Sequence, residues 1–155
     1  MGMLKRLLML MGAAEAACWR AIGPEISSPG TCEKPTREDY ERAMDSPDYM
    51  DFGVVYTYAV LEGISEESAF VLGSAYARML AEGMSKAYAI VYAAAYSIAC
   101  TLIGASEQWA RAYAAACAHV IAARESMGFA AVYGHAIADG ASPEDARAFA
   151  RRYAV

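Results

Sequence analysis

The sequence has few residues that build β-sheets, few histidines and no excess of positive charge. The short pairs Val54-Val55 and Ile90-Val91 lie inside stretches rich in alanine and tyrosine, and no longer strand-like run occurs. Because β-branched residues favour strands and alanine favours helices, this composition predicts an all-α protein. The chain of 155 residues is long enough to form one domain, 1–155, with its own hydrophobic core.

The scarcity of positive charge argues against nucleic-acid binding. The formal net charge is −5 at pH 7, whereas a protein that binds phosphates needs a basic surface. Arg147, Arg151 and Arg152 gather near the C-terminus, where cations suit the negative end of a helix dipole. We therefore expect no nucleic-acid partner.

The residue patterns of known catalytic and metal sites are also missing. His135 and Asp139 are four residues apart and could share a helix face, but His119, the only other histidine, is not at ligand spacing. The sequence contains no nucleophile elbow and no glycine-rich phosphate loop. We expect no catalytic residue, no metal and no cofactor, and hence a protein that is not an enzyme.

The four cysteines bear on the compartment. They form no C-x-x-C pair, and Cys100 and Cys117 lie among apolar residues, which predicts buried thiols. A Cys18–Cys32 bridge would fit an oxidising compartment, but reduced thiols in the cytoplasm are the simpler interpretation. A cytoplasmic location is therefore the expectation, with secretion as the alternative.

Two apolar segments raise the question of a membrane. Lys5, Arg6 and the apolar residues after them have the outline of a secretory signal, but Glu15 lies at the would-be cleavage site. We interpret residues 3–21 as an ordinary first helix. Residues 87–106 carry no charge and could span a bilayer, but a core helix enclosed by its neighbours has the same composition. Membrane association through either segment stays an alternative.

Serine recurs along the chain at a spacing of about twenty residues, which is at the short end of the periods of stacked repeats. Four of these serines follow a glycine by two positions, as in Gly63-Ile64-Ser65. Glycine can end a helix in the left-handed conformation, and serine can cap the next helix. Pro143 directly follows one serine, at a position where proline starts helices. The boundary at Arg124-Glu125-Ser126 lacks the glycine. The serines are Ser46, Ser65, Ser85, Ser106, Ser126 and Ser142.

Small residues recur at fixed distances after these serines, and large residues lie beside them. Residues four apart share a helix face, so each helix would present a narrow seam to its neighbours, as interdigitated helix packing requires. The fourth positions are Ala69, Ala89, Ala110, Ala130 and Ala146, and the eighth are Gly73, Ala93, Ala114, Gly134 and Ala150. The large seventh positions are Leu72, Tyr92, Tyr113, Tyr133 and Phe149.

The expected architecture is a set of antiparallel helices from a degenerate single-helix repeat of about twenty residues. Residues 3–21 form the N-terminal helix and residues 23–35 form a loop rich in proline and glycine. Residues 36–155 form a short helix, about 37–44, and then six repeat helices. A compact bundle and a short solenoid both fit this pattern.

The aromatic residues are the most suggestive candidates for binding. They lie four apart on three successive helices and so form stripes. One alternative is that they are the large residues of the core. The other is that they line a binding surface, because tyrosine and tryptophan are enriched at interaction hot spots. The candidate binding residues are Tyr88, Tyr92, Tyr96, Trp109, Tyr113, Phe129 and Tyr133.

These observations favour a non-enzymatic binding or scaffold module that acts through protein–protein contacts. Its apolar share of 57% exceeds what a soluble domain usually needs, which suggests a homo-oligomer or a tight protein partner. One alternative is a carrier or sensor of small apolar ligands, with a pocket between helices lined by tyrosines and Met79, Met84 or Met127. A membrane-associated helical protein is the other alternative.

Overall fold

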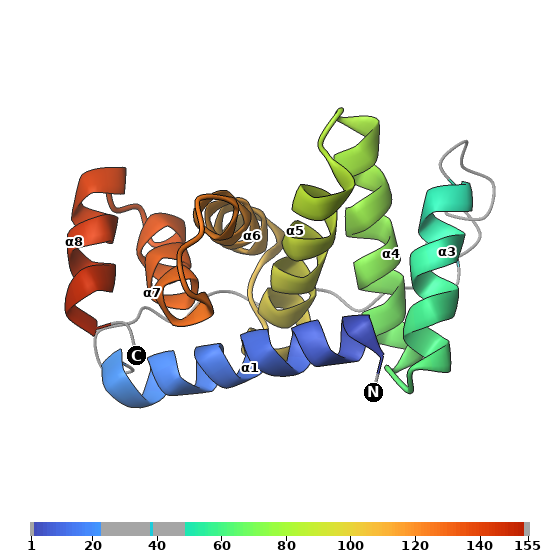
Figure 1. Cartoon of the computed structure of the whole chain (residues 1–155), viewed down its shortest axis with the longest axis horizontal. Coiled ribbons are helices and arrows are strands. Elements are labelled where there is room, and N and C mark those ends of the chain that lie inside the picture. Colours follow the sequence, from blue (N-terminus) through green and yellow to red (C-terminus); the bar gives the residue numbers. More distant parts are fainter. Residues whose placement is uncertain (1, 23–37, 39–48, 154–155) are drawn as a thin grey trace.

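The computed structural model describes residues 2–22, 38 and 49–153, and this part of the chain is all-α, as the composition predicts. Figure 1 shows the helices α3 to α8 following one another across the molecule, with α1 lying along one side. Consecutive helices pack against each other, and α1 contacts mainly α5 and α7. The helices are α1 (Met3–Ile22), α3 (Tyr49–Leu61), α4 (Glu66–Ala81), α5 (Lys86–Ile98), α6 (Glu107–Ala122), α7 (Met127–Ala138) and α8 (Pro143–Tyr153).

The predicted serine caps at the helix starts are confirmed wherever the structure describes them. Each capping serine accepts a hydrogen bond from the backbone N–H three residues later, over 3.1–3.3 Å. One of the freed amides at each helix start is thereby satisfied. The serines that cap in this way are Ser65, Ser85, Ser106, Ser126 and Ser142.

The boundary between α6 and α7, which lacks a glycine, has the same type of turn as the boundaries after α3, α4 and α7. Arg124 has a φ of 67°, close to the φ of 75° at Gly104, so an arginine takes the left-handed position. The N–H of Arg124 bonds to the carbonyl of Ile121, and the N–H of Glu125 bonds to that of Val120. This pair of bonds is the Schellman closure of a helix, and the turns after α3, α4 and α7 have it too.

One helix ends differently from the prediction. After α5 the chain makes a π-helical turn, η2 (Ala99–Ile103), and the N–H of Ala105 bonds to the carbonyl of Ala99. The step from Ser85 to Ser106 is 21 residues, one more than the steps on either side of it. A π-turn holds one extra residue within a helix. We infer that η2 accommodates this residue.

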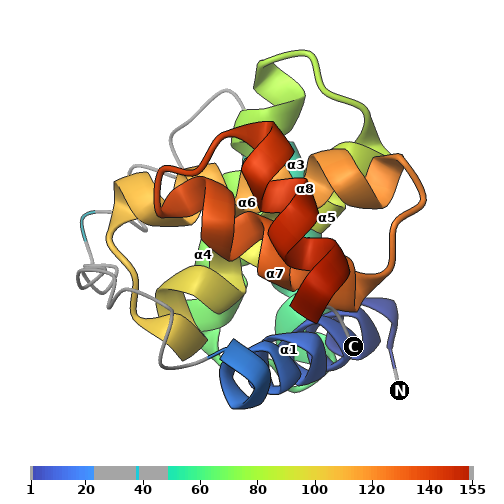
Figure 2. The same cartoon turned by 90° about the vertical axis from the view of Figure 1, so that its left-hand side faces the viewer.

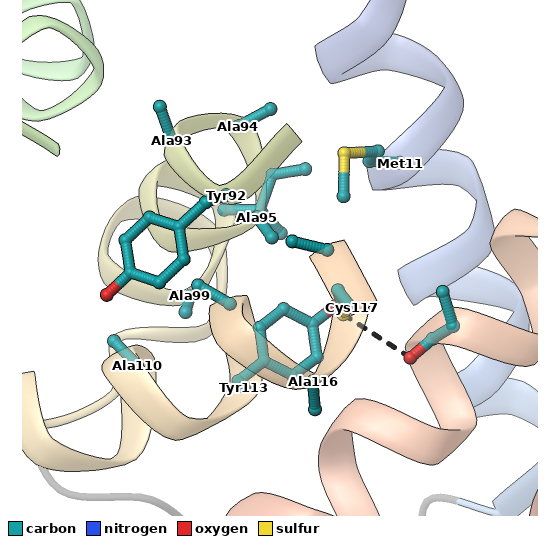
Figure 3. Close-up of a cluster of buried hydrophobic side chains, with 14 of the residues drawn as sticks. Met11, Tyr92, Ala93, Ala94, Ala95, Ala99, Ala110, Tyr113, Ala116 and Cys117 are labelled. Atoms are coloured by element: carbon teal, nitrogen blue, oxygen red, sulfur yellow. Dashed lines mark hydrogen bonds between the residues drawn. The ribbon is translucent and has the colours of Figure 1, made fainter. Parts of the chain in front are cut away.

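The small-residue seam is buried. Its five alanines at the fourth position are at most 1% exposed. At Gly73, an added Cβ would lie 2.9 Å from the carbonyl oxygen of Phe52, and at Gly134 it would lie 2.7 Å from Sγ of Cys117. Both contacts are too short for any side chain, so glycine lets these helices approach closely. Figure 3 shows how alanines surround Tyr92 and Tyr113 in this core.

The arrangement is compatible with a compact helical bundle. Figure 2, seen from the α8 end, places α1 on one side of the other helices, as Figure 1 does. The origin of the helices from one repeat unit stays a prediction. The predicted loop at 23–35, the short helix at about 37–44, the boundary at Ser46 and the Cys18–Cys32 bridge lie outside the residues and side chains that are described.

Candidate functional site

The first aromatic stripe forms a stacked ladder on α5. The ring centroids of Tyr88 and Tyr92 are 6.3 Å apart, and those of Tyr92 and Tyr96 are 6.1 Å apart. The Arg78 guanidinium lies over the rings of Tyr92 and Tyr96 and donates a hydrogen bond of 3.0 Å to the Tyr92 hydroxyl. Burial raises the pKa of Tyr92, and the Arg78 charge opposes that rise. The ladder thus joins α4 to α5.

Most of the predicted binding residues lie in the interior. Tyr92, Trp109, Tyr113, Phe129 and Tyr133 are buried, whereas Tyr88 and Tyr96 are half-buried. Burial assigns these five to the core, which is the first of the two alternatives that the sequence leaves open. They are not exposed, so a partner could reach them only if the helices moved apart. A binding role for the stripes stays a prediction.

A buried polar cluster joins three helices that are far apart in the sequence. Glu15 of α1 accepts a hydrogen bond of 2.6 Å from the Tyr113 hydroxyl of α6 and also bonds to Nε2 of His135 on α7. Glu15 and His135 are each 1% exposed and Tyr113 is 2% exposed. These hydrogen bonds give the buried carboxyl group partners on two helices, which lowers the cost of burying it.

The environment of this cluster holds the Tyr113 hydroxyl in its neutral form. Burial raises the pKa of Tyr113 well above its ordinary value, and the Cys117 thiol and the Glu15 carboxyl add to this effect. The His135 ring packs edge-on against the rings of Trp109 and Tyr113. A substrate has no access to groups this deeply buried. The cluster therefore acts as a tie that holds α1 against α6 and α7.

Sequence reasoning missed this cluster. In the sequence Glu15 stands out only because it lies at the would-be signal cleavage site, and its partners are 98 and 120 residues away along the chain. The one signal present was that Glu15 is the only charged residue in the stretch 7–19 of α1. His135 and Asp139, which the sequence predicts on one helix face, have different partners: Asp139 accepts a hydrogen bond of 2.9 Å from Nε1 of Trp109, and His135 bonds to Glu15. Among the described residues, no three His, Cys, Asp or Glu side chains could hold a metal ion.

The structure describes the surroundings of Cys100, Cys117 and the apolar segment 87–106. Cys117 is buried as expected and its thiol donates to the carbonyl of Ala130 (Figure 3), whereas Cys100 is only half-buried. No disulfide joins these two thiols. Of the described helices, only the continuous stretch Lys86–Ile103 is long and apolar enough to cross a membrane. It packs against α1, α4 and α6, as a core helix does.

The outer side of α3 exposes four large apolar residues. Met50 is 72% exposed, Val54 52%, Tyr58 61% and Leu61 78%. They recur at intervals of three or four residues and so form one stripe along the helix, which we call the α3 face. The single charged side chain of α3 is Asp51, in its first turn. The α3 face therefore carries no charge.

Two hollows adjoin the α3 face. The smaller, of about 350 Å³, is lined by the α3 face together with the small residues Gly53 and Thr57. The larger, of about 570 Å³, lies where α1, α3, α4 and α5 meet, and we call it the α3–α5 hollow. Val54 and Tyr58 belong to both hollows, so the whole surface is continuous. Its further lining includes Leu4, Val55, Glu62, Tyr76, Lys86 and Ile90.

Comparison with protein-family models, with curated proteins and with solved structures gave no match.

Proposed function

We propose that the protein is a non-enzymatic helical binding module that acts through protein–protein contacts and self-associates through the α3 face. The observation that carries the proposal is the exposure of Met50, Val54, Tyr58 and Leu61 in one uncharged stripe. Apolar residues scattered singly over a surface need no explanation, but a continuous apolar patch is typical of an interaction site.

The composition of α3 supports a partner on its outer side. The inner side of α3 packs on the core through Phe52, Val55 and Ala59, so the helix is apolar all round. A helix of this kind is normally covered on every side. It also lies at one end of the row of helices in Figure 1, where no further described helix follows it outward.

The shape of this face favours a second copy of the same chain. Gly53 and Thr57 form a shallow floor between the larger Val54, Tyr58 and Leu61. The buried helices pack by the same alternation of small and large residues. Across a two-fold axis, the large residues of one α3 could enter the small hollow of the other, since an isologous interface must be self-complementary.

Other parts of the proposal rest on the sequence. The buried tie of Glu15, Tyr113 and His135 offers no access for a substrate, which supports a module without catalysis. A cytoplasmic location remains our expectation. The alternative of a small-ligand carrier is favoured by one specific feature, the α3–α5 hollow, and is taken up below.

Size-exclusion chromatography with light scattering over a range of concentrations tests this proposal. We expect the wild type to form a dimer and Leu61→Asp to weaken it about 100-fold or more, because an unpaired carboxylate would be buried at the interface. Ala148→Asp, on the exposed side of α8, is the matched control and should leave the mass unchanged. A wild type that stays monomeric, or a Leu61→Asp variant with the wild-type mass, would contradict the proposal.

A further inference from the structure

The α3–α5 hollow combines apolar walls with a cation, which the α3 face lacks. Leu4, Val55 and Ile90 contribute aliphatic side chains to its walls, and the Lys86 side chain lines it as well. Its volume of about 570 Å³ lies within the range of small-molecule sites. A mostly apolar pocket with a few polar groups at fixed places is typical of such sites.

The two charged residues of the hollow lie toward opposite ends. Both α3 and α5 run antiparallel to α4 and therefore run in the same direction. Lys86 is the first residue of α5, whereas Glu62 directly follows the last residue of α3. The hollow is therefore charged differently at its two ends, with its apolar walls between them.

Glu62 already has a role in the fold. Its Oε2 accepts a hydrogen bond of 2.9 Å from the backbone N–H of Lys5, in the first turn of α1. A carboxylate is stabilising at the positive end of a helix dipole. Lys86, by contrast, is exposed and forms no ion pair with any described residue. The ammonium group is thus the charge that the hollow can offer to a ligand.

The place of Lys86 in its helix also needs an explanation. A cation in the first turn opposes the helix dipole, and α4, α6 and α8 have acids there instead, at Glu66, Glu107 and Glu144. α5 has no acid in its first turn. An anion bound beside Lys86 would remove the unfavourable interaction.

We propose that the α3–α5 hollow binds a single-chain amphiphile with an anionic head group, such as a fatty acid. The acyl chain lies along Val55 and Ile90, and the head group pairs with the Lys86 ammonium. Tyr76, which also lines the hollow and lies in the last two turns of α4, near the start of α5, has a hydroxyl that can serve as a further donor for the head group or its water. This site goes beyond self-association, and it shares Val54 and Tyr58 with the α3 face.

Calorimetric titration of the full chain with dodecanoate, below its micellar concentration, tests the proposal. We expect binding of one dodecanoate per chain, about tenfold weaker binding by Lys86→Gln, and wild-type affinity in Lys86→Arg, since a charged hydrogen bond contributes about 1.5 kcal/mol or more. Ala87→Trp places a large ring at an exposed position of the lining and should abolish binding. Circular dichroism confirms that each variant is folded.

Several outcomes would overturn this site. Dodecanol or dodecyltrimethylammonium binding as tightly as dodecanoate would remove the role of Lys86, and full binding by Ala87→Trp would place the ligand elsewhere. Co-sedimentation with vesicles of phosphatidylcholine and phosphatidylglycerol, without dodecanoate binding, would indicate a membrane surface instead. Leu61→Asp keeps the α3–α5 hollow intact, so its dodecanoate affinity separates a failure of this site from a failure of self-association.

Discussion

The two ends of the row of helices differ in what they show to solvent. At one end α3 exposes Met50, Val54, Tyr58 and Leu61 and no charge, whereas α8 at the other end exposes both acids and arginines. α8 buries only its alanine seam, Ala146 and Ala150, completely. Stacked-helix proteins need terminal helices with a polar outer side to stay soluble. By this criterion the polar outer side of α8 is typical of a terminal helix, whereas the apolar outer side of α3 supports our proposal that a partner covers it.

Making the outer side of α8 as apolar as that of α3 should have the largest effect, and this effect is on the mass of the assembly. The triple variant Ala148→Leu, Arg151→Leu and Arg152→Leu gives α8 an apolar outer side like that of α3. A molecule with two self-complementary ends joins its copies into open chains instead of dimers. We expect species much larger than a dimer in light scattering. If the variant keeps the wild-type mass, exposed apolar residues at a helix end are not sufficient for association in this protein.

Substitutions in the buried interior should change the free energy of unfolding and leave the oligomeric state unchanged. Glu15→Ala leaves His135 and the Tyr113 hydroxyl buried without their shared partner, so we expect a loss of about 3 kcal/mol in the free energy of unfolding. Urea unfolding, followed by circular dichroism, measures it. Glu15→Gln keeps an acceptor for Tyr113 and should lose less. If Glu15→Ala is as stable as the wild type, the buried tie contributes nothing to the docking of α1.

A smaller effect is expected from Tyr113→Phe, and it depends on pH. The pKa of Tyr113 is raised in the folded protein, so above pH 10 the unfolded chain loses a proton that the folded chain keeps. Tyr113 therefore stabilises the fold below pH 10, and this contribution declines as the pH rises toward its folded pKa. Tyr113→Phe should cost about 1 kcal/mol at neutral pH and make the alkaline decline shallower. An unchanged decline in the variant would contradict the assigned environment of Tyr113.

The smallest effect on stability should come from a substitution of Arg124. A non-glycine residue in the left-handed conformation is strained, so Arg124→Gly should stabilise the protein by about 1 kcal/mol. Gly140→Ala makes the opposite change at a similar turn and should destabilise it. Thermal unfolding of both variants provides the comparison. Destabilisation by Arg124→Gly would mean that the arginine side chain contributes more than the backbone strain costs.

The parts of the fold that depend on neighbours in the sequence could be predicted. Serine caps, glycine turns and the buried alanine seam each act within one or two helical turns, so their spacing placed α4 to α8 correctly. The π-turn at Ala99–Ile103 could not be placed, because a single extra residue in a spacing does not say which turn absorbs it. The tie of Glu15, Tyr113 and His135 depends on where α1 packs, which no local pattern encodes.

The candidate site was predicted less well than the fold. The aromatic stripes were recognised as helix faces, but spacing alone does not say whether a face turns inward or outward, and five of the seven residues turned inward. The spacing does not single out the α3 face: Met50 and Val54 lie four and eight residues after Ser46, where the later repeats have alanine or glycine. Because α3 lies at one end of the row of helices, the large Met50 and Val54 face outward there.

The most direct test of the account is photo-crosslinking from the α3 face. p-Benzoylphenylalanine in place of Tyr58 is close in shape to the exposed tyrosine, and the same residue in place of Ala148 on α8 is the control. The account predicts that irradiation at position 58 gives a covalent dimer whose crosslinked peptides lie within α3, and that position 148 gives none. No dimer from position 58, or equal yields from the two positions, would contradict the claim that copies of this chain join through α3.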